Sequence, residues 1–260
     1  MKLPVSDCNW LHQTTYKLTY SEFVMSNTLS SQSEFKRFTK ELNEGERVEG
    51  ELLKTFLYSV LSSIAIIGIL YIEIFRHMED FIPKYGFYVF FVVLSYAVII
   101  PSIRQVRAYK QFACMSGMMI GMTSGMIAGF LSGFFVGATN GMFWGSVFGM
   151  GVGIVLGIWN GKSCGIMGIM EGMMAGFMGG LMGAMSSVMM LNDNLKAASV
   201  IVFVISAVIM FSLNYMIYKE MKENERQTNE AHFITVVISV ILTLLTVLFM
   251  VFGPRSVFLL

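Results

Sequence analysis

Charged residues and cysteines are scarce in this sequence. Asp, Glu, Lys and Arg make up 13% of its 260 residues, about half the share that is usual in soluble domains. The net charge of +1 and the lack of a basic patch give no indication of a nucleic-acid partner. Three cysteines, an odd number with scattered spacing, do not make a disulfide framework.

Motifs of the common enzyme classes are also missing. Nothing resembles a nucleotide-binding loop, a hydrolase triad or a haem-binding histidine pair, and His12, His77 and His232 lie outside the glycine-rich core. We therefore do not expect an enzyme. Hydrophobic residues, by contrast, reach 55% with a mean hydropathy of +0.66, and several apolar runs are long enough to cross a bilayer. This composition predicts an all-α polytopic membrane protein, with the lipid bilayer as its first partner.

The apolar runs predict about seven transmembrane helices, which fall into groups. A polar N-terminal segment, residues 1–51, contains a possible amphipathic helix from Ser33. Residues 52–110 hold two helices and a basic loop, residues 113–190 hold a core of three, and residues 197–252 hold two more. The individual spans are expected at residues 52–75, 85–103, 113–138, 141–159, 163–190, 197–218 and 232–252.

Positive charge indicates the orientation of these helices. With seven spans, only Arg76, Lys84, Lys196 and Arg255 fall on one side, and the other 14 of the 18 Lys and Arg residues fall on the opposite side. The positive-inside rule then predicts a cytoplasmic N-terminus and an outside C-terminus. Arg104, Arg107 and Lys110 form the basic cytoplasmic loop in this topology. The expected location is the cytoplasmic (plasma) membrane.

Glycine recurs at every fourth position from Gly117 to Gly165. Spacing of this kind, a glycine zipper of GxxxG motifs, allows two helix backbones to approach closely in a right-handed crossing. The expected packing residues are Gly117, Gly121, Gly125, Gly129, Gly133, Gly172, Gly176 and Gly180. Their contacts are expected within the chain, between copies of it, or with other membrane subunits. Turns are predicted at Asn140-Gly141 and Asn160-Gly161, because Asn-Gly is a favoured turn dipeptide.

Methionine crowds the same stretch, with 16 of the 23 methionines between Met115 and Met190. On a helical wheel of the fifth span, Glu171 shares one face with sulfur-bearing side chains, and glycines occupy a separate face. The members of this sulfur face are Cys164, Met167, Met174, Met178, Met182, Met185 and Met189. A carboxyl group inside a membrane span is commonly functional, as a proton carrier or an ion ligand.

Thioether and thiolate sulfur prefer soft ions such as Cu(I), which makes Cu(I) the expected metal if one is bound. The predicted ligand set comprises Cys164, Met167, Glu171, Met174, Met178 and Met182 with Cys114, Met118 and Met122. The spacing Met118-x3-Met122-x3-Met126 resembles the Met-x3-Met element of eukaryotic copper importers, which also use Gly-x3-Gly packing. The resemblance covers a handful of residues and implies shared chemistry, not membership of that family.

Two main interpretations follow, from different functional classes. The first is a transporter or channel that handles a soft metal ion through a core lined by Met, Cys and Glu side chains. The second is a non-transporting scaffold or assembly subunit, in which methionine fills gaps beside glycine or faces lipid. A proton- or cation-linked channel for another ion is a third.

Overall fold

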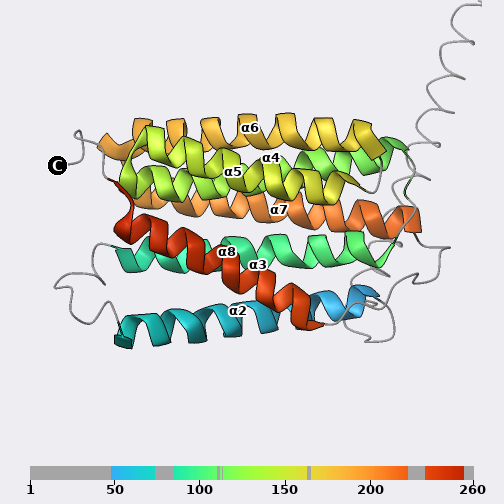
Figure 1. The fold of residues 1–260 in the computed structure, drawn as a ribbon, viewed down its shortest axis with the longest axis horizontal. Coiled ribbons are helices and arrows are strands. Elements are labelled where there is room, and N and C mark those ends of the chain that lie inside the picture. The colour runs from blue at the N-terminus through green and yellow to red at the C-terminus, as the bar shows by residue number, and fades with distance from the viewer. Residues whose placement is uncertain are drawn as a thin grey trace, which may run out of the picture.

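The computed structural model describes residues 48–73, 85–109, 112, 114–162, 165–221 and 232–254 (Figure 1). These residues form seven α-helices and no strand, which confirms the all-α class. The helices are α2 (Val48–Glu73), α3 (Phe87–Ala108), α4 (Cys114–Asn140), α5 (Met142–Gly161), α6 (Gly165–Met189), α7 (Leu195–Met221) and α8 (His232–Phe252), with a short 3₁₀ helix, η4 (Met190–Asn192), before α7. The amphipathic helix expected near Ser33 lies outside the described residues.

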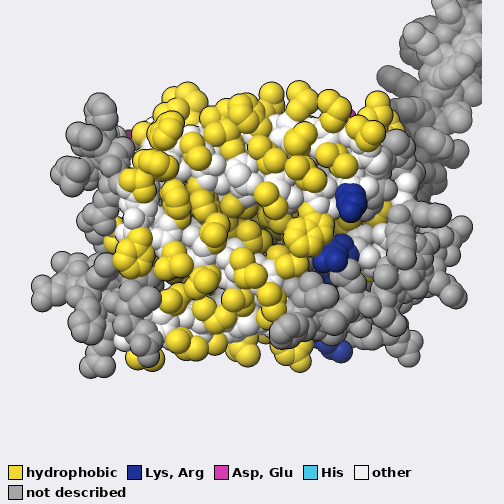
Figure 2. All heavy atoms as spheres, viewed as in Figure 1, with side chains coloured by type: hydrophobic (Ala, Val, Ile, Leu, Met, Phe, Trp, Pro, Cys, Tyr) yellow, Lys and Arg dark blue, Asp and Glu magenta, His cyan; other side chains and the backbone are white. Residues whose placement is uncertain are grey.

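Six of the described helices are long and apolar enough to cross a membrane, and α8 contributes a shorter apolar segment, Val236–Phe252. The helices lie roughly side by side, with α4, α5 and α6 grouped at one edge and α2 at the other (Figure 1). Hydrophobic side chains cover most of the face in Figure 2. An apolar exterior of this extent is what a bilayer requires, because lipid tails offer no hydrogen bonds.

The three central helices meet in successive layers, and each layer takes one small residue from each helix. The layers are Gly121, Gly161 and Gly168; Gly125, Gly157 and Gly172; Gly129, Gly153 and Gly176; Gly133, Gly149 and Gly180; and Gly137, Gly145 and Ala184. From the first layer to the last, the residue numbers on α4 and α6 increase, whereas those on α5 decrease. Helices α4 and α6 are therefore parallel, and α5 is antiparallel to both.

Backbone meets backbone in the four layers made of glycine alone, which leaves no room for a side chain. A Cβ atom on Gly125 would lie 2.9 Å from the carbonyl oxygen of Gly172 and 3.0 Å from the Cα of Gly157. A Cβ on Gly133 would lie 2.6 Å from the carbonyl oxygen of Gly180. Each glycine costs a helix about 1 kcal/mol relative to alanine. Close van der Waals contact between the three backbones offsets that cost.

Short connections join the central helices. Helix α4 ends at Asn140, and Gly141 turns the chain with φ of 99°, a left-handed conformation that glycine adopts readily. At the other end α5 continues through Asn160 to Gly161, and α6 begins at Gly165, whose φ is +76°. The turn therefore comes later than the Asn160-Gly161 position expected from the dipeptide. Asn160 and Gly161 are both buried, and Gly161 belongs to the first packing layer.

Helix α3 passes through Pro101 and ends only at Ala108. The sequence predicted a span ending near Ile103 and a basic loop after it. Arg104 and Arg107 instead lie inside the helix. Proline is tolerated within membrane helices because neighbouring groups satisfy the backbone carbonyl that it leaves without a donor. Around α3 the core consists of large side chains, among them Ile99, Ile103, Phe134 and Phe135, so this part of the bundle packs differently from the glycine layers.

The glycine layers predict a sharp difference between two α5 positions that are two residues apart. A Cβ on Gly153 would lie 2.8 Å from the Cα of Gly129, whereas a Cβ on Gly151 would meet nothing within 4 Å. We expect Gly153→Ala to destabilise the purified protein by about 1–3 kcal/mol through overpacking. Gly151→Ala should leave stability unchanged or raise it slightly. Thermal unfolding in detergent, followed by circular dichroism, measures both variants. Equal melting temperatures would contradict the layered packing.

Candidate functional site

Helix α6 presents two different surfaces. Its glycines and Ala175 are buried against α4 and α5. Seven of its eight methionines are between 44% and 67% exposed on the other side, whereas Met173 is 38% exposed. The seven are Met167, Met170, Met174, Met178, Met182, Met185 and Met189. We call this set, with Glu171, the α6 methionine face. In the single chain this face lies on the outside of the bundle, and the glycine side faces inward.

Glu171 is half-buried and lies on the methionine face, one turn from Met167 and from Met174. It is six residues into α6, about 9 Å along the helix at 1.5 Å per residue. A carboxyl group at that depth is costly in contact with lipid alone. The α6 methionine face therefore combines soft sulfur ligands with one hard, ionisable group.

Helix α4 carries a second row of methionines. Met118 is half-buried, and Met122 and Met126 are partly exposed on the outer surface. The backbone of Met126 packs against Gly179 of α6, so the last member of this row lies beside the α4–α6 contact. Because α4 and α6 are parallel, both rows start at the same end of the bundle. Cys164 and the side chain of Cys114, which the sequence adds to this set, lie outside the described residues.

The predicted ligands do not converge on an interior cavity of the single chain. The described residues contain no group of three or more His, Cys, Asp or Glu side chains able to hold a metal ion. The space between α4, α5 and α6 is filled by backbone contacts. The α6 members of the predicted set that the structure describes lie on the outer surface of the single chain.

The two asparagines predicted at turns are both buried. Asn140 donates through Nδ2 to the carbonyl oxygen of Phe249 at 2.8 Å, which ties the end of α4 to α8. Asn160 has neither amide atom hydrogen-bonded among the described residues. Asn160 follows Phe148, Val152 and Leu156 at four-residue intervals on α5, and all three belong to the apolar core. It therefore ends a core-facing row and does not form a turn.

A row of buried hydroxyl groups between α2, α3 and α8 escaped the sequence analysis. Thr55, Ser59 and Ser63 recur at every fourth residue of α2 and are buried. Ser59 and Ser239 share a hydrogen bond of 2.6 Å between their hydroxyl groups, and Thr55 accepts a hydrogen bond from Arg104. Small polar residues at this spacing in an apolar span are a readable signal for helix contacts.

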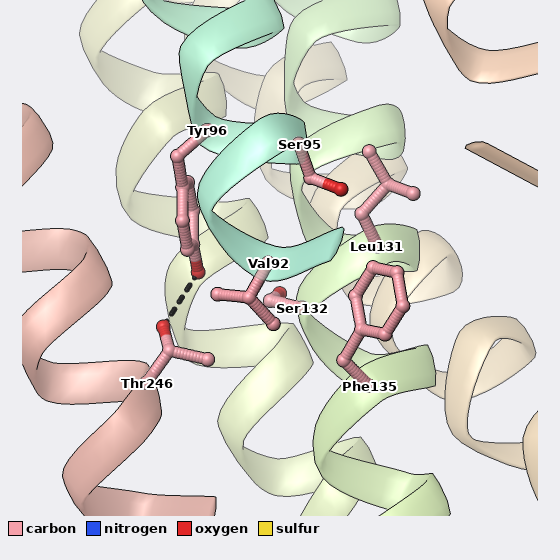
Figure 3. A pocket seen from close by; sticks show the side chains of 7 residues that line it. All are labelled: Val92, Ser95, Tyr96, Leu131, Ser132, Phe135 and Thr246. Atoms are coloured by element: carbon pink, nitrogen blue, oxygen red, sulfur yellow. Dashed lines mark hydrogen bonds between the residues drawn. The ribbon is translucent and has the colours of Figure 1, made fainter. Parts of the chain in front are cut away.

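Figure 3 shows the continuation of this row, where Tyr96 of α3 points toward Thr246 of α8. Their hydroxyl groups lie 2.8 Å apart. The surrounding pocket leaves no room for a water molecule. Ser95 and Ser132, which also line it, hydrogen-bond carbonyl oxygens of their own helices. The pocket is thus a packed helix junction and offers no binding space.

At the end of the bundle where α3 finishes, two arginines occupy adjacent turns. Arg104 is 3% exposed and donates to Thr55. The Arg107 guanidinium lies over the Trp159 ring, 5.3 Å from its centroid, in a cation–π arrangement. These contacts link α3 to α2 and α5. On the face in Figure 2 the Lys and Arg side chains gather toward the same end of an otherwise apolar surface.

The helices and their apolar exterior make the chain an all-α polytopic, integral membrane protein. No protein-family model matches it, and no curated protein or solved structure shows significant similarity to it. Arguments about function therefore rest on the residues themselves.

Exposure predicts that methionines of α6 contribute little to stability. Met174 is 63% exposed on α6, whereas Met210 of α7 is 1% exposed in the core. We expect Met210→Ala to cost about 2–5 kcal/mol, because it leaves a cavity. In a detergent that keeps the chain monomeric, Met174→Ala should cost less than about 0.5 kcal/mol, the range of surface substitutions. Thermal unfolding of both variants in the same detergent tests this. A large loss of stability for Met174→Ala would show that the α6 methionine face is packed.

Proposed function

We propose that this chain is a membrane transport subunit for a soft metal ion, with Cu(I) as the favoured ion. The observation that carries the proposal is the division of α6. The glycine side of α6 packs against the backbones of α4 and α5, and its methionine face, with Glu171, lies on the outside of the bundle. Successive thioethers along one helix offer weak, equivalent sites, which suit a moving soft ion. In this proposal the protein is a transporter and not an enzyme.

The path is proposed to form between copies of the chain. Closed glycine layers, here acting as an intramolecular glycine zipper, leave no space for an ion between α4, α5 and α6. Two or more α6 methionine faces brought together would enclose a line of sulfur atoms. The same contact would remove Glu171 from lipid, which favours association over exposure.

Orientation gives the proposed path a direction. The parallel arrangement of α4 and α6 brings their first residues to one end of the bundle. With the N-terminus in the cytoplasm of a plasma-membrane protein, that end would be cytoplasmic. Cys114 and Cys164 would then flank the cytoplasmic mouth. A reducing compartment would keep both cysteines as thiols, which are able to take Cu(I).

The second candidate is a non-transporting membrane scaffold, and the closed glycine core favours it. Backbone-to-backbone contact along the whole length of three helices gives a rigid unit. In that case the methionine face would serve only as a contact for lipid or another subunit. Metal binding separates the two candidates, because a scaffold has no need of it.

Removing two thioethers should separate metal chemistry from packing. The double variant Met174→Leu, Met178→Leu keeps side-chain volume but loses the sulfur, so we expect Cu(I) affinity to fall at least about tenfold, or about 1.4 kcal/mol. The control, Met119→Leu with Met142→Leu, removes two exposed methionines elsewhere and should leave affinity unchanged. Competition with a chromophoric Cu(I) chelator measures affinity, and native mass spectrometry reports oligomeric state. A wild-type protein that binds no Cu(I) would exclude the transport proposal and favour the scaffold.

Glu171 offers a separate test of transport. Glu171→Gln keeps the shape of the side chain and replaces its carboxyl group with an amide, which does not ionise. We expect the variant to fold and to bind Cu(I) through its methionines, but to lose most Cu(I) flux into proteoliposomes, because the proposed role of the carboxyl is to move a proton or the ion. Flux is measured with an entrapped Cu(I) indicator. Wild-type flux in a folded Glu171→Gln protein would remove the carboxyl from the mechanism.

A further inference from the structure

A small hollow between α3 and α8 lies at the end of the bundle that carries the arginines. Its described lining consists of Ile100, Ile103, Arg104 and Arg107 of α3 and Ile238 of α8. Its volume is about 10 Å³, room for roughly one water-sized group. The described lining therefore combines two arginines with three branched apolar residues, and none of these five residues is acidic.

The two arginines occupy this hollow because of their positions on α3. Residues 100, 103, 104 and 107 follow the three- and four-residue steps of one helix face. Arg104 is fixed by its hydrogen bond to Thr55, and Arg107 by the Trp159 ring beneath it. Both side chains are thus held in place, which lowers the entropy lost when a ligand binds.

The depth of the arginines indicates what they face. Arg104 lies four residues before the end of α3, about 6 Å along the axis at 1.5 Å per residue. The two guanidiniums therefore sit near the boundary between lipid headgroups and acyl chains. Trp159, an amphipathic ring, lies at the same level, where interfacial aromatics are enriched. The isoleucines extend from this level toward the middle of the bundle.

We propose that this hollow binds the phosphate of an anionic phospholipid. One phosphate oxygen enters the hollow toward Arg104, and Arg107 contacts the headgroup from its stacked position on Trp159. An acyl chain lies along Ile100 and Ile238. Basic pockets between transmembrane helices are known to select anionic lipids by these interactions. A free phosphate ion would gain nothing from the apolar wall, so the ligand is a lipid.

Lipid selectivity of the full-length protein tests the proposal. The protein is incubated in detergent with equal amounts of phosphatidylglycerol and phosphatidylcholine, and the retained lipids are counted by native mass spectrometry. We expect the wild type to retain phosphatidylglycerol preferentially. Arg107→Gln should reduce that preference about fivefold, the effect of one basic group near a membrane surface. Wild-type retention without preference would overturn the proposal.

Two further variants make the test specific. Lys162→Gln removes one positive charge from an exposed position at the same end, outside the hollow, and should leave the preference within twofold of wild type. Ile238→Phe keeps both arginines and fills the hollow, so we expect it to lose the preference. Equal effects of Arg107→Gln and Lys162→Gln would mean that anionic lipid is attracted by the overall positive charge at this end and would overturn the proposal. An unchanged preference in Ile238→Phe would also overturn it. Displacement of the lipid by millimolar inorganic phosphate would identify a free-anion site instead.

Discussion

Contact between three helix backbones is the constraint on which this structure depends. In lipid there is no hydrophobic drive to bring apolar helices together, so close packing has to supply the attraction. Layers such as Gly125, Gly157 and Gly172 achieve this by removing the side chains at the contact. One turn later the next layer repeats it. The packing therefore requires glycine at every fourth residue of α4 and α5. It also requires a small residue at every fourth position from Gly168 to Ala184 of α6.

The same constraint decides where methionine goes. When one side of α6 is reduced to backbone, every large side chain of that helix is left for the other side. Met174 and Met178 are exposed because Gly172, Gly176 and Gly180 are buried. The reactive groups of α6 consequently lie on the outer surface of the bundle. A single chain can offer sulfur and one carboxyl along that surface, and only a partner can turn it into an enclosed path.

The sequence was sufficient to predict the helix class, the approximate spans and the turn at Asn140-Gly141. It could not predict which glycines meet. A four-residue period fits many registers equally well, and the observed register depends on the lengths of the two connections. The prediction of a turn at Asn160 was wrong for a related reason: the first layer needs Gly161, so α5 continues past Asn160. Pro101 suggested an early end for α3, but the surrounding bundle tolerates it, so Arg104 lies within the helix. The helical wheel separated the methionine face of α6 from its glycine face, but which of the two lies outward depends on the packing.

Two packing modes meet at α3. On one side lies the glycine bundle, where 72% of the residues in the most apolar stretch of α4 are buried. On the other side lies α2, where only 17% of the residues in the corresponding stretch are buried. Helix α2 is attached by apolar contacts of Ile67, Leu70 and Tyr71 and by hydroxyl contacts such as Ser59 to Ser239. Interhelical hydrogen bonds in membranes contribute only about 0.6 kcal/mol each on average. An anchor at the helix end therefore matters more for α2 than for α5. Arg104 provides one by joining α3 to Thr55, and Arg107 joins the same turn of α3 to α5 through Trp159. Neutralising these charges with a lipid phosphate would strengthen the junction where the bundle is least tightly packed.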